Sequence, residues 1–307
     1  MQVLNYSAEP LHRLYGWLPR GLAASTAVFF PDTCPGKSPL PTGTVVLTQQ
    51  ADWRRFAVSD CGCGMLLAKS DLPAAAFSRA AWDAIYADLK RNKGKLGDLG
   101  SGNHFLDALV SYDTDELYFL IHTGSRNESK LVDHLIDQPK AFDAKFADVC
   151  DWAADNRRAV LKVVERHFGR THIVLDKNHN HFEHTADGVI IRKGAARLLP
   201  GELAVIPSSM NGDVVTVRGK AAVAEVFHSI CHGTGRTMSR SEAKLHAAAY
   251  DYDALRERIY LPAAIANASI KTDAPYCYRA LDDCLPLISE LVSVEQRFRV
   301  IAYLGQL

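Results

Sequence analysis

The stretch Ser59-Asp-Cys-Gly-Cys-Gly-Met65 constrains this chain more than any other short segment does. Gly62 and Gly64 flank Cys63, and because glycine has no Cβ, the backbone there can turn tightly and approach an ion closely. The carboxylate of Asp60 and the thiolate of Cys63 can then point into one space, offering a hard oxygen and a soft sulfur able to bridge two metal ions. Taken alone, the stretch is also typical of a tight turn with two buried cysteines. The histidines elsewhere in the chain are therefore needed to distinguish a metal site from a structural turn.

Length and composition place the chain among globular proteins with a substantial core. It has 307 residues, of which 48% are hydrophobic and 23% charged, as in ordinary soluble domains. The charges of its 35 basic and 35 acidic residues cancel, so the formal net charge is zero. Any site for a polyanion therefore has to be a local cluster of cations. The sequence has neither a signal peptide nor an apolar stretch of membrane-spanning length. It therefore predicts a cytoplasmic protein without a membrane partner, in which the seven cysteines stay reduced.

Hydrophobic periodicity predicts helices and strands mixed along the chain. Strands are predicted at 44–49, 55–58, 116–122, 172–175, 188–191, 203–207, 213–218 and 297–304. Helices are predicted at 72–92, 129–168 with a break near Pro139, 240–249, 252–258 and 281–291. Because there is neither a regular βαβ rhythm nor an internal repeat, the sequence predicts one α+β domain over residues 1–307.

Two histidines lie beside small, polar or glycine-rich residues that suit a phosphate or metal site. Asn103 and His104 close the loop that begins at Gly97, and backbone N–H groups of such glycine-rich loops can cradle phosphate. His122 ends an apolar run and precedes Thr-Gly-Ser-Arg126, so Arg126 is available for bidentate contact with a phosphate. A flexible turn and a core histidine with a satisfied ring are the competing interpretations.

The densest histidine cluster is Asn178-His-Asn-His-Phe-Glu-His184. Histidine-rich segments often bind metal, but neighbours on an extended chain point to opposite sides. Either His179 and His181 share a face, or only one of them is a ligand, and a solvated polar loop is the alternative. Further along, Arg192-Lys193 follows a predicted strand where two cations can hold phosphates, and Ser208-Ser209 offers hydroxyl donors in a turn.

The last motif is Cys231-His-Gly-Thr-Gly-Arg-Thr-Met-Ser-Arg240. If a helix begins at Arg236, then Arg236 and Arg240 share a face, and His232 lies at the anion-favouring N-terminal end. Histidine can act as a nucleophile and form a phosphoramidate with a nucleotide, so His232 is the predicted catalytic residue. The sequence contains no P-loop, no His-Glu-x-x-His, no Gly-x-Ser-x-Gly and no paired Cys-x-x-Cys zinc site.

The ordered set of motifs resembles the RtcB family of RNA ligases and covers the chain from about Asp60 to the C-terminus. The matching stretches are Asp60-Cys-Gly-Cys-Gly-Met, Leu99-Gly-Ser-Gly-Asn-His-Phe-Leu, His122-Thr-Gly-Ser-Arg, His179-Asn, Arg192-Lys-Gly-Ala, Ile206-Pro-Ser-Ser-Met and His232-Gly-Thr-Gly-Arg-Thr-Met-Ser-Arg. Seven motifs in the family's order are far more specific than any one of them. The resemblance implies an α+β fold in which mixed β-sheets and surrounding helices enclose a dinuclear metal site.

The resemblance also implies roles for individual residues. The implied ligands of two Mn²⁺ ions, with the thiolate bridging, are Asp60, Cys63, His104, His122 and His179. His232 matches the histidine that the family guanylylates with GTP. The implied nucleotide-binding residues are Asn103, Asp107, Asn180, Ser209 and Tyr278. The implied binding residues for the phosphates of substrate are Arg126, Lys193, Arg236 and Arg240.

The implied reaction has three nucleotidyl-transfer steps. His232 attacks the α-phosphate of GTP and releases pyrophosphate, and the GMP passes to an RNA 3′-phosphate after any 2′,3′-cyclic phosphate has been opened. An RNA 5′-hydroxyl then attacks the activated end, which joins the strands and releases GMP, in the repair or maturation of structured RNA. Two metal ions can neutralise phosphate charge and orient an in-line displacement. A metal-dependent phosphoesterase and a non-catalytic RNA-binding relative are the alternatives.

The base-recognition end departs from the family pattern, whereas the metal and phosphate end keeps it. The lysine that precedes the final glycine in most members is missing from Ile301-Ala-Tyr-Leu-Gly-Gln-Leu307. Val214 stands where members carry a serine, and Asp107 replaces the usual glutamate, while Tyr278 matches a base-side tyrosine. The resemblance therefore implies weaker selection of GTP over other nucleotides, unless a residue of the tail such as Gln306 compensates.

Overall fold

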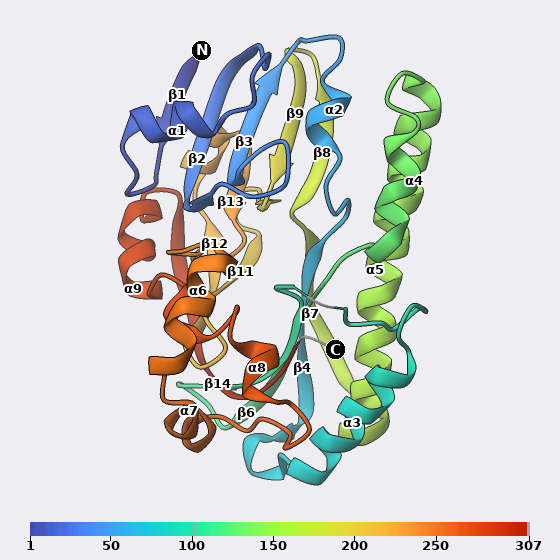
Figure 1. The fold of residues 1–307 in the computed structure, drawn as a ribbon, viewed down its shortest axis with the longest axis vertical. Helices are drawn as coiled ribbons and strands as arrows, with labels where there is room; N and C mark the ends of the chain where they lie inside the picture. The colour runs from blue at the N-terminus through green and yellow to red at the C-terminus, as the bar shows by residue number, and fades with distance from the viewer. Residues whose placement is uncertain (101, 306–307) are drawn as a thin grey trace.

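Two β-sheets, one above the other in Figure 1, form the framework of the molecule. The computed structural model describes residues 1–100 and 102–305, except for the side chain of Arg126. Within these residues the smaller sheet has five strands in the order β1 (Gln2–Asn5), β2 (Ala24–Cys34), β3 (Thr42–Thr48), β9 (Gly188–Lys193) and β8 (Asn180–Thr185). The larger sheet has seven described strands, in the order β11 (Leu203–Pro207), β12 (Asp213–Gly219), β14 (Val292–Gly305), β5 (Phe105–Ser111), β6 (Glu116–Thr123), β4 (Gly64–Pro73) and β7 (Thr171–Asn178). A separate antiparallel pair joins β10 (Ala195–Arg197) and β13 (Ser229–Cys231).

Helices surround the sheets. The α-helices of the described chain are α1 (Leu11–Trp17), α2 (Arg54–Ala57), α3 (Arg79–Arg91), α4 (Lys130–Asp133), α5 (Pro139–Phe168), α6 (Arg240–His246), α7 (Tyr252–Arg258), α8 (Asn267–Ile270) and α9 (Leu281–Cys284). Short 3₁₀ turns are η1 (Ala74–Ala76), η2 (Arg126–Ser129), η3 (Ala221–Val226), η4 (Ala247–Ala249), η5 (Pro275–Cys277) and η6 (Leu285–Ile288). Over the residues that the structure describes, none of these helices has the length and apolar character needed to cross a membrane.

Helix α5 has 30 residues and packs against β4, β6 and β7 (Figure 1). It begins with Pro139 in its first turn, where a missing N–H costs nothing. Phe142 and Phe146, near its start, are buried in the core cluster that also contains residues of β2, β3 and β9. Val160 and Val164, near its end, are buried in the cluster of β4, β5 and β6. One rigid element therefore contributes to the cores of both sheets and fixes the junction between them.

The predicted motifs meet at this junction because strands begin or end there. The chain passes from β7 to β8 through a single residue, His179. Gly64 opens β4 immediately after the Asp60–Cys63 turn and pairs with β6 and β7. His122 lies near the end of β6, opposite Phe105, the first residue of β5. Segments that are far apart in sequence thus present their ends in one place.

The predicted α+β class is confirmed, and most predicted elements are present with shifted ends. The predicted strand 55–58 is wrong, because Arg54–Ala57 forms helix α2. The predicted helix 72–92 begins only at Arg79, since strand β4 continues to Pro73. The predicted helix 281–291 is divided into α9 and η6. Short apolar runs do not distinguish a strand from a helix turn, and the tertiary contacts decide between them.

Candidate active site

The turn Asp60–Cys63 has a backbone conformation that few residue types tolerate. Asp60 has a φ of 48° and Gly62 a φ of 70°, in the left-handed region where a side chain is strained. A Cβ on Gly62 would lie 2.8 Å from Cα of Cys150, so α5 packs directly on this glycine. A strained aspartate persists only where its surroundings enforce it, and such residues cluster at functional sites.

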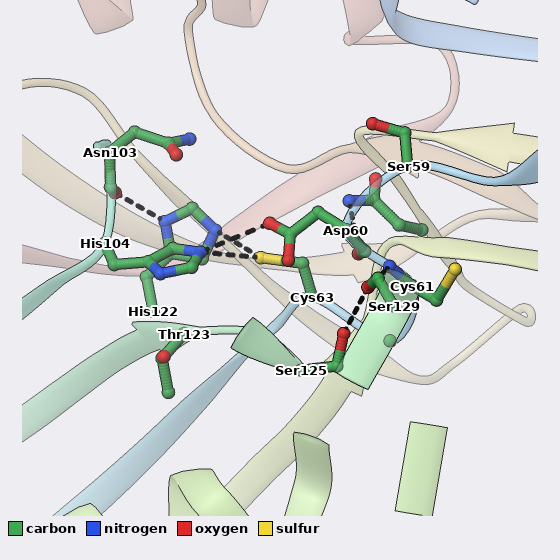
Figure 2. Close-up of polar contacts among 12 residues, drawn as sticks. Ser59, Asp60, Cys61, Cys63, Asn103, His104, His122, Thr123, Ser125 and Ser129 are labelled. Atoms are coloured by element: carbon green, nitrogen blue, oxygen red, sulfur yellow. Dashed lines mark hydrogen bonds and ion pairs between the residues drawn. The ribbon is translucent and has the colours of Figure 1, made fainter. Parts of the chain in front are cut away.

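Gly124 gives the side chains of this turn their room. A Cβ on Gly124 would lie 2.5 Å from Oδ1 of Asp60 and 3.1 Å from Cβ of Cys63. The N–H of Cys63 donates to the carbonyl oxygen of Asp60 at 3.1 Å, and both side chains point toward the histidines (Figure 2). The glycine of the His122 motif is therefore required by the Asp60 motif, which lies about sixty residues earlier in the chain.

Five side chains predicted as metal ligands converge at the junction of the sheets. Sγ of Cys63 lies 3.4 Å from Nε2 of His104 and 3.3 Å from Nε2 of His122 (Figure 2). Nε2 of His104 lies 3.3 Å from Oδ2 of Asp60, and Nε2 of His122 lies 3.3 Å from Nε2 of His179. These donors form two groups that share Cys63, and within each group all donor atoms lie within 4.8 Å of one another. The groups are Asp60–Cys63–His104 and Cys63–His122–His179.

The arrangement of donor atoms fits metal ions. Nδ1 of His122 lies 2.9 Å from the carbonyl oxygen of Asn103, which can only accept, so Nδ1 carries the proton. Nε2 of His122 therefore presents a lone pair, and it faces both Sγ of Cys63 and Nε2 of His179. Electron-rich atoms at this spacing attract a cation, and thiolate, imidazole and carboxylate together suit divalent transition metals. Two groups with one common thiolate match a dinuclear site.

Burial and neighbouring charges set the protonation of these donor groups. Burial lowers the pKa of His122 and of His179 well below the usual value, and neighbouring histidines lower it further, so both rings stay neutral. Burial opposes ionisation of Asp60, but the hydrogen bond and charge of His104 and the charge of Lys193 hold its pKa below the usual range. Burial raises the pKa of the Cys63 thiol well above its usual value. A bound cation reverses this last effect, because coordination deprotonates a thiol.

His232, the predicted nucleophile, lies against the second donor group. The centroid of its ring is 4.4 Å from that of His179 and 5.8 Å from that of His122. Its Nδ1 lies 2.6 Å from Oδ2 of Asp32 and 2.9 Å from the carbonyl oxygen of Gly194. The carbonyl can only accept a hydrogen bond, so Nδ1 carries the proton and Nε2 keeps the lone pair that an attack on phosphorus requires.

Asp32 is a functional candidate that the sequence analysis missed. It is fully buried in β2, and burial raises the pKa of its carboxyl, while the hydrogen bond with His232 acts in the opposite direction. Its signal in the sequence is a carboxylate that directly follows the apolar run Ala27-Val-Phe-Phe-Pro31. Isolated charges are rarely buried without a partner, so an aspartate in such a strand points to a second polar residue from elsewhere in the fold.

Replacing Asp32 with asparagine is expected to slow nucleotide transfer to His232 about 10- to 100-fold. The amide has nearly the same size, but it cannot stabilise the positive charge that the ring gains when Nε2 bonds to phosphorus, and charge-assisted hydrogen bonds are about twice as strong as neutral ones. The measurement is the single-turnover rate of covalent labelling by GTP, with metal content measured in parallel. An unchanged rate at unchanged metal content would show that Asp32 serves packing alone.

The predicted helix at 240–249 is confirmed in its start, and the alternative start at Arg236, on which the placement of His232 at a helix N-terminus depended, is wrong. Helix α6 begins at Arg240, where Ser239 and Glu242 form a capping box that fixes its start, and His232 does not lie at its N-terminal end. Arg236 precedes the helix and pairs with Tyr278 in an isolated β-bridge. His232 therefore owes its orientation to Asp32 and Gly194 rather than to a helix dipole.

Asp273 joins the two arginines to the predicted base-side tyrosine. Its Oδ1 lies 3.1 Å from an Nη atom of Arg236, 3.4 Å from one of Arg240 and 2.9 Å from the hydroxyl of Tyr278. Asp273 is 3% exposed, so these contacts are shielded from solvent. The other Nη atom of Arg236 is buried and has no hydrogen-bond partner among the described residues. An unpartnered guanidinium N–H of this kind suits an incoming anion.

Asp107, predicted to bind the nucleotide, lies beside Tyr303, a residue without a predicted role in the site. The two residues are opposite each other in the β5–β14 pairing. Both are nearly fully buried, and Oδ1 of Asp107 has no hydrogen-bond partner within the described chain. Burial raises the pKa of Asp107 well above its usual value. The ring of Tyr303 stacks on Phe105 with centroids 6.2 Å apart, and Phe105 packs against His122.

Other predicted site residues bind neighbouring parts of the chain. Nζ of Lys193 donates to the carbonyl and hydroxyl oxygens of Ser59 at 3.0 and 3.2 Å. The amide of Asn180 donates to the carbonyl of Asp60 at 3.0 Å and accepts from the N–H of Gly194 at 2.8 Å. It therefore ties the Asp60–Cys63 turn, called the metal loop below, to the segment next to His232. Ser209 bonds Asn211 within its own turn.

Two of the predicted cations do not add a described contact to the site. Arg192 is buried and binds Glu183, Ser229 and the carbonyl of Phe227, so its guanidinium supports the fold rather than a phosphate. The side chain of Arg126 lies outside the described residues, as does Gln306.

Comparison with known proteins agrees with the geometry. The sequence model of the RtcB family, described as tRNA-splicing ligase RtcB, matches residues 139–305, more than half of the 307 residues. The chain belongs to the RtcB family. The matched stretch includes His179 and His232. The other four predicted ligands of this family member, Asp60, Cys63, His104 and His122, precede the match.

Individual RtcB relatives extend the likeness along more of the chain. The tRNA-splicing ligase RtcB of Nanoarchaeum equitans is 28% identical over 294 residues, covering 72% of this chain and 62% of that protein. The RNA-splicing ligase RtcB2 of Escherichia coli is 26% identical over 323 residues, covering 87% and 84%. The tRNA-splicing ligase RtcB of Pyrococcus furiosus is 28% identical over 284 residues, covering 68% and 29%. This chain thus spans less than two thirds of the two archaeal relatives and most of the bacterial one.

Proposed function

We propose that this protein is a GTP- and manganese-dependent RNA ligase that joins RNA 3′-phosphate or 2′,3′-cyclic phosphate ends to 5′-hydroxyl ends. The observation that carries the proposal is the position of His232, whose Nδ1–H binds Asp32 and Gly194 while its ring contacts one of two donor groups that share Cys63. A nucleophile with a fixed tautomer beside a dinuclear donor set is suited to nucleotidyl transfer. We propose that residues 1–307 act as one catalytic unit.

The residues of the chain have the following parts in the proposed reaction. Nε2 of His232 forms a bond to the α-phosphorus of GTP while the bond to the bridging oxygen breaks and pyrophosphate leaves. Asp32 and the carbonyl of Gly194 hold the proton on Nδ1 throughout. The GMP then passes to an RNA 3′-phosphate, and a 5′-hydroxyl displaces GMP from the activated end. When bound, the two ions supply positive charge that neutralises the reacting phosphates.

The phosphates of the nucleotide are proposed to bind beside Arg236. Its unpartnered Nη atom is able to donate to an anion, and Asp273 and Tyr278 hold the guanidinium in place. Arg240 shares Asp273 and is half exposed, so it is positioned to contact a phosphate at the rim of the site.

Incubation with labelled GTP and manganese tests the proposal. A ligase of this kind acquires a covalent, acid-labile nucleotide and joins a 3′-phosphate RNA to a 5′-hydroxyl RNA. A phosphoesterase opens 2′,3′-cyclic phosphates or hydrolyses the nucleotide without becoming labelled, and a non-catalytic RNA-binding protein does neither. The absence of labelling in the presence of two bound ions would contradict the proposed function.

Selection of GTP over ATP is expected to be weaker than in typical family members by roughly 2–4 kcal/mol, or roughly 30- to 1000-fold. Each polar group of the guanine base that lacks a hydrogen-bond partner in the pocket costs about 1–3 kcal/mol of binding free energy. Val214 is fully buried in β12 and offers no side-chain hydrogen bond, and Asp107 is shorter than glutamate. Competition between GTP and ATP for covalent labelling measures the ratio. Strict GTP selectivity would mean that another residue, with Tyr303 beside Asp107 as the first to test, has replaced the missing contacts.

A further inference from the structure

A cavity of about 440 Å³ opens onto one side of the donor set. One wall comes from the metal loop and the segment before β5, and the other comes from η2 and α4. Its lining residues are Val58, Ser59, Asp60, Asn103, His104, Asn127, Ser129, Lys130 and Asp133. Figure 2 shows Asp60, Asn103 and His104 around this side of the site. The cavity therefore reaches the first donor group directly.

The second donor group does not share this cavity. The lining includes Asp60 and His104 but neither His122 nor His179, and it does not include His232. Arg236 and Tyr278, at the proposed nucleotide end, are also absent from the described lining. The cavity thus reaches the first donor group, whereas the ring of His232 contacts the second.

The wall that carries Lys130 is attached to the metal loop. Oγ of Ser129 accepts a hydrogen bond from the N–H of Cys61 at 2.8 Å and also bonds Ser125 (Figure 2). Lys130 is the next residue and is exposed. Lys130 therefore lines the cavity from an element that is hydrogen-bonded to the loop of Asp60 and Cys63.

We propose that this cavity admits the 3′-terminal nucleotides of the RNA strand, with Lys130 binding a backbone phosphate and Asn127 flanking it. The inference rests on the proposed function. Transfer of GMP from His232 to an RNA 3′-phosphate needs the RNA end to reach the nucleotide, and a second entrance allows the RNA to approach without displacing that nucleotide. The lining is polar, and the ammonium of Lys130 and the amide of Asn127 offer N–H donors to phosphate oxygens.

The charges around the cavity predict effects of opposite sign. Lys130 attracts the RNA backbone, whereas Asp133 repels it, and both line the mouth. Asp60 is the remaining carboxylate of the lining, and its charge is offset by His104 and Lys193. Removal of the lysine charge should therefore weaken RNA binding, and removal of the Asp133 charge should strengthen it.

The test uses a fluorescent oligoribonucleotide with a 3′-phosphate and the full chain loaded with manganese. For Lys130→Ala we expect the dissociation constant to rise about three- to ten-fold, and the slope of log Kd against log salt to fall by about 0.7, the value for one contact to a single-stranded phosphate. Lys130→Arg should retain wild-type binding, and Asp133→Asn should tighten it. Lys140→Ala is the matched control, because Lys140 is exposed in the first turn of α5 and does not line the cavity.

Covalent labelling by GTP without RNA separates this inference from the proposed function. Lys130→Ala should be labelled at the wild-type rate, since the nucleotide is proposed to bind beside His232 and Arg236, which do not line this cavity. An unchanged dissociation constant and salt slope for Lys130→Ala would overturn the inference. A raised KM for GTP in the labelling step would also overturn it, by assigning the cavity to the nucleotide. A wild-type protein that resists labelling but binds RNA through Lys130 would overturn the proposed function and leave the RNA cavity supported.

Discussion

The replacement of His232 with alanine is expected to reduce covalent labelling by GTP to below detection while both metal ions remain bound. In the proposed reaction the ring supplies the attacking nitrogen Nε2, while Nδ1 binds Asp32 and Gly194, so alanine removes the proposed nucleophile. His232 belongs to neither group of donor atoms, which is why the metal content should not change. The measurements are radiolabel transfer from GTP and metal analysis of the purified variant.

The same variant should still join RNA that carries a preformed 3′-diphosphate-linked guanosine, because the histidine is needed only to load the nucleotide. Alanine also leaves the buried carboxyl of Asp32 without its partner, at a cost of about 1–3 kcal/mol in the free energy of unfolding. His232→Gln offers that carboxyl an amide N–H and is the second variant. His184→Ala, at an exposed histidine bound to Asp143, is the matched control. Normal labelling of both His232 variants would move the nucleophile to another residue, with His181 and His184 the first to be tested.

The replacement of Cys63 with alanine is expected to abolish metal loading and covalent labelling together. Cys63 is the only residue common to the two groups of donor atoms found in the described chain, so one substitution leaves each group with two ligands. Loss of a ligand also leaves the buried nitrogen atoms of His104 and His122 without the thiolate that they face at 3.3–3.4 Å. The measurements are metal content after dialysis and labelling by GTP over a range of manganese concentrations.

Cys61→Ala is the matched control for this prediction. Cys61 is buried two residues away and belongs to neither donor group of the described residues, and its backbone N–H, which binds Ser129, is kept in alanine. It should lose some stability through the small cavity that remains but retain both ions. Two ions at full occupancy in Cys63→Ala would refute the bridging role, and loss of metal from Cys61→Ala alone would move the thiolate ligand to that residue.

Much of the candidate site is predictable from the sequence because its residues lie within short motifs. Each motif combines a residue predicted to bind metal or phosphate with a glycine that allows the local backbone conformation or leaves space for a side chain. Examples are Asp60 with Gly62 and His122 with Gly124. These local relations survive in the structure: Gly62 has the positive φ that its position requires, and Gly124 leaves the space that Asp60 occupies. The family and the set of residues that converge followed from such motifs, and the α+β class followed from mixed helices and strands without a βαβ rhythm.

The partners of these motif residues were not predictable, because they come from distant segments without a motif of their own. Asp32 orients His232 across 200 positions of the chain, and Asp273 holds Arg236 from 37 positions away. An aspartate in an apolar strand signals that some partner exists, but the sequence does not name it. Lys130 likewise gains its position beside the site from tertiary contacts, including the hydrogen bond between Ser129 and the backbone of Cys61.

Short segments of sequence set which residue types are available and the local turns that present them, since backbone sterics and side-chain chemistry act over a few residues. Only the tertiary structure divides the donors into two groups around Cys63 and forms the cavity beside Asp60 and His104. The physical reason is that strand pairing and burial fix distances between segments. Helix α5 and the crossing of the chain at His179 from the larger to the smaller sheet bring these segments within bonding distance.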